Sequence, residues 1–252
     1  MAKLDKIVEF LDSELLSQNV EDSSNNGLQV ENSGKVTGAV CGVDASLEFF
    51  TAARDRGADL LVCHHGISWG DSLKQITGIN YRRLRFLLEN DMALYACHLP
   101  LDMHPRYGNN ARLAEAFNLQ NCRPFGLHGG AMVGLAGNLD KPVNYAQFKE
   151  TVRAVVGREP QTMDFAKQTV QTVAVVSGGA AEDTEEAARQ GIDVYVSGEP
   201  ALQAYVVARD YGINAIFAGH YATETFGVKA LDEILKDRFG IKTEFIDLGI
   251  EY

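Results

Sequence analysis

Histidines and carboxylates follow three apolar runs of this sequence, at the point where each run ends. Imidazole nitrogens and carboxylate oxygens are ligands of first-row divalent metals, and the set includes no thiolate. Ligands also collect where the strands of an open α/β sheet end. The sequence therefore predicts a metal site assembled from three separate strand ends. Its candidate ligands are His64, His65, Asp102, His220 and Glu224.

Each of these residues also has an ordinary structural interpretation. Adjacent strand residues point to opposite faces, so His64 and His65 can share a site only where the strand has ended, and the glycine after them permits the turn. Otherwise one of them is a helix cap or a packed imidazole. Asp102 alone fits a loop aspartate that accepts backbone N–H groups. His220 and Glu224 lie on one face of a helix start, where a terminal histidine beside an exposed glutamate would also fit.

The candidate ligand set, with three imidazoles and two carboxylates, is larger than the three protein ligands of an open catalytic zinc site. It suits two ions about 3.5–4 Å apart that share a carboxylate. Mixed nitrogen and oxygen ligation is compatible with zinc, iron, manganese or cobalt. His98 and His104, which flank Asp102, could orient that carboxylate or move protons, and a structural imidazole fits each equally well. We therefore expect two divalent metal ions per chain.

The elements that must position these side chains alternate along the chain. Apolar, β-branched runs predict strands, and helical stripes fall between them. This alternation is typical of βαβ units, so we expect an α/β fold with largely parallel or mixed sheets covered by helices. The predicted strands are 36–43, 59–64, 92–98, 170–177, 192–197, 213–219 and 243–248, and the clearest helices are 46–56, 79–89, 109–117, 180–190 and 200–211.

A glycine-rich segment at 124–138 breaks the alternation. We expect it to mark a seam between an N-terminal half, residues 1–123, and a C-terminal half, residues 124–252. The first half then carries the first three candidate ligands and the second carries the other two. Two shorter polar stretches also suggest turns. The one at 25–30 indicates a hairpin or a loop, and the one at 177–179 could cradle an anion, although a plain tight turn explains it better.

Composition limits the class of protein. The chain has 252 residues, 46% hydrophobic and 23% charged, as in a soluble globular protein. Its net charge of −11 makes nucleic acid an unlikely partner, because phosphate binding relies on lysine and arginine. The apolar runs are shorter than the roughly 20 residues of a membrane span, and the first residues are too charged for a signal peptide, so we expect a cytoplasmic protein. The four cysteines form no CxxC pair and are expected to be reduced thiols.

Several motifs that contain the candidate ligands resemble one known family. They follow one another in order along nearly the whole chain, and CHHG, the LD pair after a strand and GHYATE are specific in combination. At these residues the sequence resembles the GTP cyclohydrolase I type 2 family, also called the NIF-three-like family. The motifs are NNGLQV (25–30), GADLLVCHHG (57–66), HLPLDMHPRYGNNARLA (98–114), SGG (177–179), SGEP (197–200) and GHYATE (219–224).

The resemblance implies two intertwined α/β domains, a ring-shaped homohexamer and a dinuclear metal centre that uses the same five ligands, with Glu224 as the bridge. This chain resembles the short members, which lack the domain inserted mid-chain in some relatives. The expected function is that of a metal-dependent hydrolase acting on a small or nucleotide-like molecule. A non-enzymatic metal-handling or regulatory, partner-binding role is the alternative. The substrate stays open, because the chain has no recognisable triphosphate-binding loop.

Overall fold

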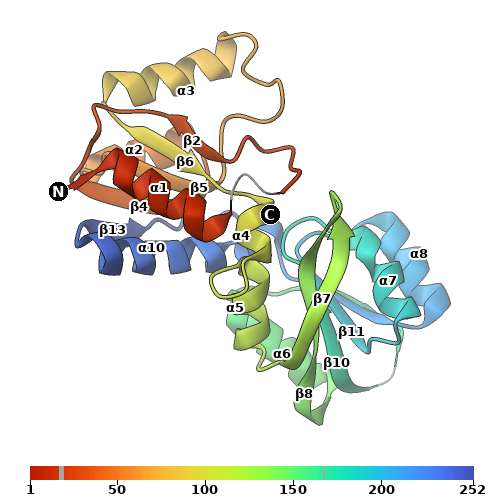
Figure 1. Ribbon diagram of the computed structural model, residues 1–252. Helices are drawn as coiled ribbons and strands as arrows, with labels where there is room; N and C mark the ends of the chain where they lie inside the picture. Colours follow the sequence, from red (N-terminus) through yellow and green to blue (C-terminus); the bar gives the residue numbers. More distant parts are fainter. Residues whose placement is uncertain (17–19, 167) are drawn as a thin grey trace. The chain divides into compact units, whose positions relative to one another are not determined.

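The computed structural model describes residues 1–16, 20–166 and 168–252. The chain forms two compact units (Figure 1). Unit 1 contains Met1–Leu101 and Gly227–Gly249, and unit 2 contains Asp102–Phe226 and Ile250–Tyr252. The chain therefore completes most of unit 1, builds unit 2, and then returns to add a helix and a strand to unit 1.

A five-stranded sheet forms the centre of unit 1. Its first four strands are parallel to one another, and the last is antiparallel to its neighbour. Because of this arrangement, β4, β5 and β6 end at the same edge of the sheet, where Asp44 is in register with His65. In spatial order the strands are β13 (Lys242–Phe245), β4 (Gly38–Asp44), β5 (Leu60–His65), β6 (Ala93–Ala96) and β2 (Gly27–Val30), and a separate short pair joins β1 (Ala2–Lys3) to β3 (Lys35–Val36).

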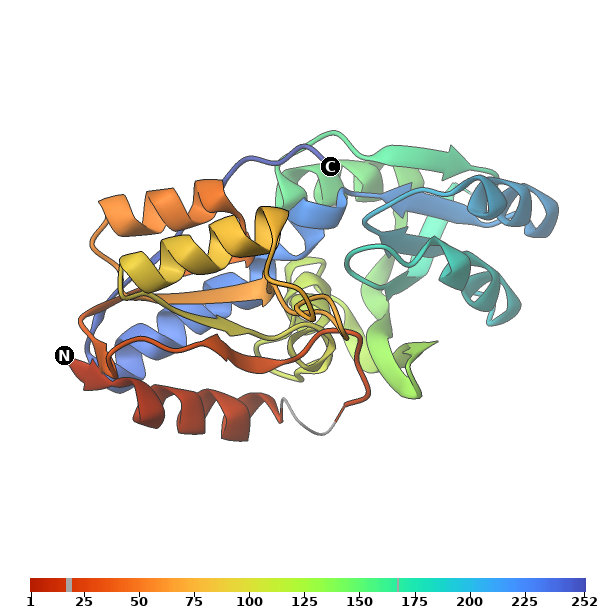
Figure 2. The ribbon, with the colours of Figure 1, turned by 90° about the horizontal axis from the view of Figure 1, so that it is seen from above.

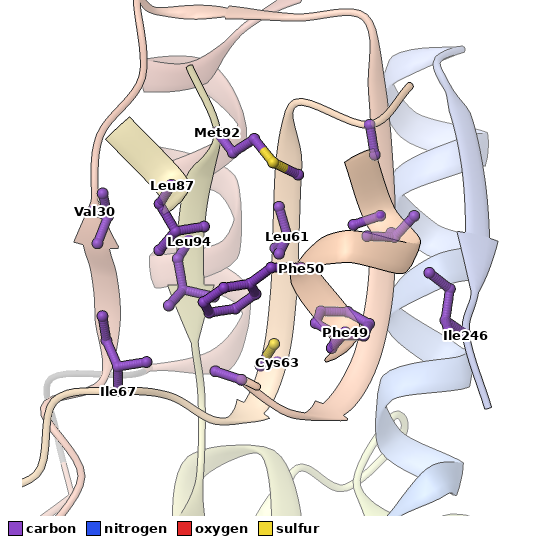
Figure 3. Close-up of a cluster of buried hydrophobic side chains, with 14 residues drawn as sticks. Val30, Phe49, Phe50, Leu61, Cys63, Ile67, Leu87, Met92, Leu94 and Ile246 are labelled. Carbon is purple, nitrogen blue, oxygen red and sulfur yellow. The ribbon is translucent and has the colours of Figure 1, made fainter. Parts of the chain in front are cut away.

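Helices cover both faces of the unit 1 sheet. On one face, α2 (Leu47–Asp55) and α3 (Gly78–Glu89) pack together through Phe49, Phe50 and Leu87 (Figures 2 and 3). Burial of a side chain of this size stabilises the fold by about 1.5–3 kcal/mol. On the other face lie α1 (Leu4–Leu15), whose Asp12 accepts a hydrogen bond from the Tyr95 hydroxyl of β6, and α10 (Thr225–Phe239). The buried face of α1 consists of Leu4, Ile7, Leu11 and Leu15.

Unit 2 has a six-stranded mixed sheet. Its three central strands are parallel, so they too end at one edge, while the outer strands are antiparallel. In spatial order the strands are β7 (Gln120–His128), β8 (Ala131–Asn144), β10 (Thr169–Val175), β11 (Val194–Ser197), β12 (Asn214–Phe217) and β9 (Gln161–Asp164).

Helices also cover both faces of the unit 2 sheet. On one face, α5 (Asn109–Ala116) and α6 (Tyr145–Val156) bury aromatic and aliphatic side chains against the valines of β10 and β11. On the other, α8 (Leu202–Tyr211) packs through its alanines, with α7 (Thr184–Arg189) beside it. The short helices are α4 (Leu99–Met103), α9 (His220–Thr223) and the 3-10 turn η1 (Ala181–Asp183).

The fold class predicted from the sequence is confirmed: this is a two-unit α/β protein with mixed sheets. The division of the chain differs from the expected halves, 1–123 and 124–252, because the units change over after Leu101 and after Phe226. The glycine-rich segment 124–138 does not separate them but lies in the β7–β8 hairpin, where Gly129 and Gly130 adopt the positive φ of a tight turn. In the described part of the chain, every helix is too short or too polar to cross a membrane.

Candidate metal centre

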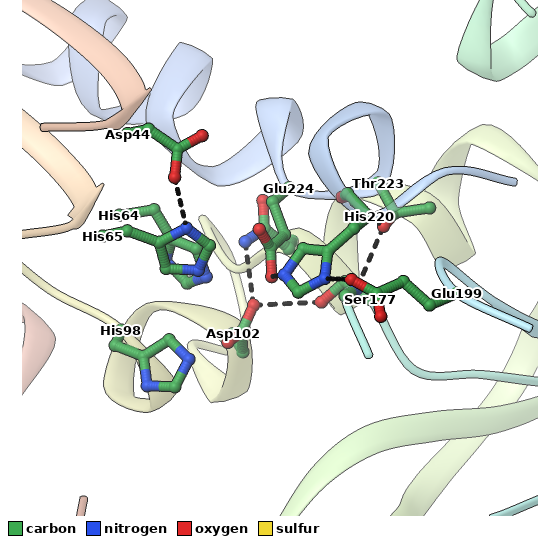
Figure 4. Close-up of polar contacts among 12 residues, drawn as sticks. Asp44, His64, His65, His98, Asp102, Ser177, Glu199, His220, Thr223 and Glu224 are labelled. Atoms are coloured by element: carbon green, nitrogen blue, oxygen red, sulfur yellow. Dashed lines mark hydrogen bonds and ion pairs between the residues drawn. The ribbon is translucent and has the colours of Figure 1, made fainter. Parts of the chain in front are cut away.

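The ends of the parallel strands in unit 1 carry two of the candidate ligands. His64 and His65 are the last residues of β5, and the centroids of their rings lie 4.6 Å apart. The Nδ1 atom of His65 lies 2.9 Å from a carboxylate oxygen of Asp44, the last residue of β4 (Figure 4). The Nδ1 atom of His64, which is buried, lies 2.9 Å from the backbone oxygen of Cys97, just beyond β6.

These contacts determine which nitrogen each ring offers to a ligand. A carbonyl oxygen and a carboxylate only accept hydrogen bonds, so Nδ1 of His64 and of His65 must carry the proton. In a neutral imidazole the lone pair then lies on Nε2, the atom that binds metal when Nδ1–H is held by an oxygen acceptor. Both rings are therefore in the tautomer that a metal ligand needs.

The strand ends of unit 2 repeat this arrangement. His220 begins α9 just beyond β12, and its Nδ1 atom is hydrogen bonded to Glu199, which follows the parallel neighbour β11. On the other side of the ring, Nε2 lies 3.0 Å from Oε1 of Glu224. The Glu224 side chain is only 3% exposed. Two Lewis bases this close share either a proton or a cation, which makes this pair a candidate for metal binding.

Asp102 belongs to the same unit. It is 4% exposed, and its Oδ1 atom accepts hydrogen bonds from Asn109 at 2.8 Å and from the hydroxyl of Ser177 at 3.0 Å. Neutral donors of this kind orient a carboxylate without neutralising its charge. An oriented, buried carboxylate is a suitable oxygen ligand for a divalent cation.

The turn that follows β10 lies against both His220 and Glu224. Gly178 has φ +68, and a Cβ atom at this position would lie 2.4 Å from Oε1 of Glu224 and 3.3 Å from Nε2 of His220. Only glycine combines this backbone conformation with so close an approach. The turn at 177–179, interpreted from the sequence as a plain tight turn, is thus part of the candidate site, because its serine contacts Asp102 and its glycine leaves room for Glu224.

Two of the three remaining histidines, His104 and His128, do not share the arrangement of the candidate ligands. Nδ1 of His104 accepts the backbone N–H groups of Arg106 and Tyr107, so its ring serves as a structural group in the loop after α4. His128 at the end of β7 turns its Nε2 atom to Asp183, 2.8 Å away. The structural interpretation that the sequence left open for His104 is therefore the one that fits its contacts.

The cysteines offer no alternative ligand set. None of the four is in a disulfide, and three of them are buried. Burial raises the pKa of the Cys41 and Cys63 thiols well above its ordinary value, which keeps them protonated. The donors that suit a metal are therefore imidazole nitrogens and carboxylate oxygens, as the sequence indicated.

Sequence reasoning did not identify the residues that orient the candidate ligands. Asp44 and Glu199 each hold the Nδ1 atom of a histidine, and Ser177 holds Asp102. One signal could have found them, since each residue ends or follows a strand that is parallel to other strands of its sheet. Which strands are neighbours, however, becomes known only from the sheet topology.

Fold and side-chain chemistry together define a class: two-unit α/β proteins with imidazole and carboxylate groups gathered at the ends of parallel strands. Comparison with family models places the chain within this class. The chain belongs to the family described as Duf34/NIF3 (NGG1p interacting factor 3), whose model matches residues 2–249. The resemblance inferred from the motifs is thereby confirmed.

Curated relatives support the same assignment. A protein from Pyrococcus horikoshii is 43% identical over 244 residues, covering 96% of this chain and 97% of its own length. A protein from Deinococcus radiodurans is 39% identical over 243 residues, covering 96% of this chain and 92% of its own length. Both are named "GTP cyclohydrolase 1 type 2 homolog".

Solved structures agree with the fold. The protein ybgI, described as of unknown function, superimposes with a TM-score of 0.93 at 34% identity and full coverage of both chains. Reduced HcgD from Methanocaldococcus jannaschii gives a TM-score of 0.86 at 29% identity and 98% coverage of each chain. The whole chain, and not a part of it, is therefore similar to these proteins.

Proposed function

We propose that this protein is a dinuclear metal-dependent hydrolase that acts on a small or nucleotide-like molecule. Its ligands are His64 and His65 from unit 1 together with Asp102, His220 and Glu224 from unit 2, with Glu224 as the bridging carboxylate. The ions are divalent zinc, iron, manganese or cobalt, which accept this mixture of nitrogen and oxygen donors.

One observation carries the proposal. Each histidine of the ligand set has its Nδ1 atom against an oxygen acceptor from a neighbouring strand end, namely the Cys97 backbone oxygen, Asp44 or Glu199. Carboxylate or carbonyl acceptors behind metal-binding histidines fix the tautomer and raise the basicity of the ring. Packing alone does not require a histidine to have this arrangement. It occurs at all three histidines of the ligand set, whereas His104 and His128 lack it.

The residues of the chain have separate roles in this proposal. Bound divalent ions supply Lewis-acid chemistry, which lowers the pKa of water and polarises a carbonyl or phosphoryl oxygen. Asp44 and Glu199 keep the imidazoles of His65 and His220 in the binding tautomer. Ser177 orients the Asp102 carboxylate, while Gly178 leaves room for Glu224.

The substrate is proposed only as a class. The curated relatives carry a name that refers to GTP cyclohydrolase. For this chain the name supports hydrolysis of a ring in a nucleotide-like molecule, and a Lewis-acidic metal centre would also suit a phosphoester. The net charge of −11 weakens non-specific attraction of a polyanion, so we propose a small molecule and not a nucleic acid.

A second candidate is a non-enzymatic protein that handles metal or binds a partner. The family description refers to an interacting factor, which favours this alternative.

We further propose a cytoplasmic homo-oligomer, a hexamer by family resemblance. Apolar side chains on the outer surface of α8 are consistent with an interface, since Leu202 is 81% and Val206 51% exposed.

The proposed hydrolysis is tested by assaying metal-loaded protein against GTP, phosphoesters and cyclic amides. The variants are His64→Ala in unit 1 and Glu224→Gln in unit 2. Each is expected to lower kcat/KM by roughly 100-fold or more, since even outer-shell changes cost up to that much. Glu159→Gln, at an exposed residue of unit 2, is the matched control and should retain full activity.

Two results would count against hydrolysis at this site. Activity that survives both ligand variants would place the chemistry elsewhere. Absence of turnover across the panel, combined with metal uptake and metal-dependent capture of a partner, would favour the non-enzymatic candidate. The same preparations should be examined by light scattering, which measures the number of chains in the assembly.

A further inference from the structure

His98 is a third imidazole at the strand ends of unit 1, and the proposed ligand set leaves it out. It lies two residues beyond β6, with its ring centroid 5.1 Å from that of His64 and 5.5 Å from that of His65. One ring nitrogen from each of these three histidines falls within 4.8 Å of the other two. All three belong to unit 1, so this cluster needs nothing from unit 2.

Asp22 orients the His98 ring through a hydrogen bond to its Nδ1 atom. Its Oδ1 atom lies 2.8 Å from Nδ1 of His98, and its side chain is only 1% exposed. Backbone N–H groups of Ser24 and Leu99 and the side-chain amide of Asn26 also donate to this carboxylate. Donors on both carboxylate oxygens therefore hold the Asp22 side chain in one orientation as a hydrogen-bond acceptor.

The tautomer of His98 follows from this contact. The Asp22 oxygens accept hydrogen bonds from their other partners, so Nδ1–H of His98 donates to Asp22, and in a neutral imidazole Nε2 then carries the lone pair. His64 and His65 are in the same state, for the reasons given above. Three Nε2 atoms with lone pairs therefore come from one cluster of rings.

The surroundings of the cluster also suit a metal. The Trp69 ring packs edge-on against His98, with centroids 5.1 Å apart, and lies 5.8 Å from His65. Its indole N–H donates to the Gly66 backbone oxygen, which fixes the ring in place. An apolar wall of this kind reduces access of solvent to a metal and strengthens its electrostatic interactions.

We propose that His98 is a further metal ligand, and that His64, His65 and His98 form a three-imidazole site in unit 1 that binds a divalent ion without help from unit 2. Asp22 is the positioning residue for His98. Three imidazoles with an open fourth position are a known arrangement for catalytic zinc. This inference rests on the metal-binding part of the proposed function and adds a ligand to it.

The test uses the full chain with the unit 2 ligands removed, as the double variant His220→Ala, Glu224→Gln. Zinc or cobalt is titrated into this protein against a competing chelator. The inference predicts that one ion per chain still binds. Adding His98→Gln should weaken that binding by at least the roughly 10- to 100-fold that an outer-shell change costs, and adding Asp22→Asn should weaken it by roughly 10-fold. His104→Gln in the same background is the matched control and should change nothing.

A second readout needs no change at His98. Long-range ¹H–¹⁵N spectra of the imidazoles in the metal-free double variant should show Nδ1–H tautomers for His64, His65 and His98. Addition of zinc should then shift the Nε2 resonances of all three, whereas a purely structural His98 would not respond.

The outcomes separate this inference from the proposed function. If the wild-type protein binds two ions but the double variant binds none, or if His98→Gln leaves its affinity unchanged, the inference fails and the five-ligand centre stands. An unshifted Nε2 resonance of His98 would overturn it in the same way. If the wild-type protein binds no divalent ion, both fail together.

Discussion

At the scale of single residues, the orientation of each candidate imidazole is set by the oxygen acceptor that is hydrogen bonded to its Nδ1 atom. His65 and His220 lie in different units, yet each has a carboxylate against Nδ1 from a strand end 21 residues earlier in the chain. This repeated arrangement gives the two units the same local chemistry. His104 differs in hydrogen-bond direction, because its Nδ1 atom accepts, and His128 differs in that Nε2, and not Nδ1, faces the carboxylate.

Gly178 gives the first prediction at this scale. Substitution Gly178→Ala adds a Cβ atom where φ is +68 and where Oε1 of Glu224 is 2.4 Å away. The left-handed conformation alone costs about 1–2 kcal/mol, and the overlap with Glu224 adds to that. We expect a lower free energy of unfolding and weaker metal binding, measured by urea denaturation and chelator competition.

Gly191→Ala is the control for this prediction. Gly191 lies in the same unit with φ +71 and has no atom within 4 Å of an added Cβ, so it carries the conformational cost alone. Equal loss of stability and unchanged metal binding in both variants would show that Gly178 does not constrain Glu224.

The candidate ligands could be named from the sequence because each combines a ligand type with a position after an apolar run. The residues that orient them could not. Asp44 and Glu199 resemble ordinary strand-end acids until the neighbouring strand is known, and Asp22 lies 76 residues from His98. Contacts of such long sequence separation depend on strand order, which a single sequence does not display.

At the scale of elements, parallel strands explain why groups distant in sequence gather at one edge. The buried strands were predicted well because their apolar, β-branched runs are continuous. Strands β2 and β8 fall in segments interpreted as a hairpin or loop and as a seam. Strands β7 and β9 were missed because they are mostly exposed and show no apolar run. The same exposure explains why the β7–β8 hairpin was interpreted as a seam.

His128 gives a prediction for this hairpin. The hydrogen bond to Asp183 raises the pKa of His128, although burial acts in the opposite direction. The folded state therefore binds the proton more tightly than the unfolded state. The resulting stabilisation is fully present below about pH 6.5 and is lost as pH rises through the raised pKa of the folded protein.

Hydrogen exchange measures this effect directly. After correction for intrinsic rates, amides of β7 and β8 should exchange faster at pH 8.5 than at pH 6, by an amount that corresponds to about 1 kcal/mol for a partly exposed pair. His128→Gln should remove the difference, and His104→Gln should leave it. A hairpin whose protection does not depend on His128 would contradict the account.

At the scale of the whole molecule, the chain passes from unit 1 to unit 2 and back, and the proposed ligands are divided between the units. The family model matches residues 2–249, so it covers nearly all of both units. This passage could not be predicted from the sequence, because the boundaries after Leu101 and Phe226 fall within helices α4 and α10 and carry no linker composition.

Metal removal gives a prediction at this scale. A ligand that binds only the folded protein at about a hundredfold excess over Kd adds about 2.7 kcal/mol of stability. Chelation should therefore lower the thermal unfolding midpoint by several degrees, and returning zinc should restore it. The double variant His64→Ala, Glu224→Gln should show little of this response. An equal shift in that variant would place the stabilising metal elsewhere.

The central claim is that His64, His65, Asp102, His220 and Glu224 bind two divalent ions. Elemental analysis of gently purified protein, combined with anomalous-scattering maps from crystals of the same preparation, tests it most directly. The account predicts two ions per chain, with Glu224 bound to both and with His64 and His65 among the ligands. Fewer than two ions after soaking with zinc, or ions bound away from these five residues, would contradict it.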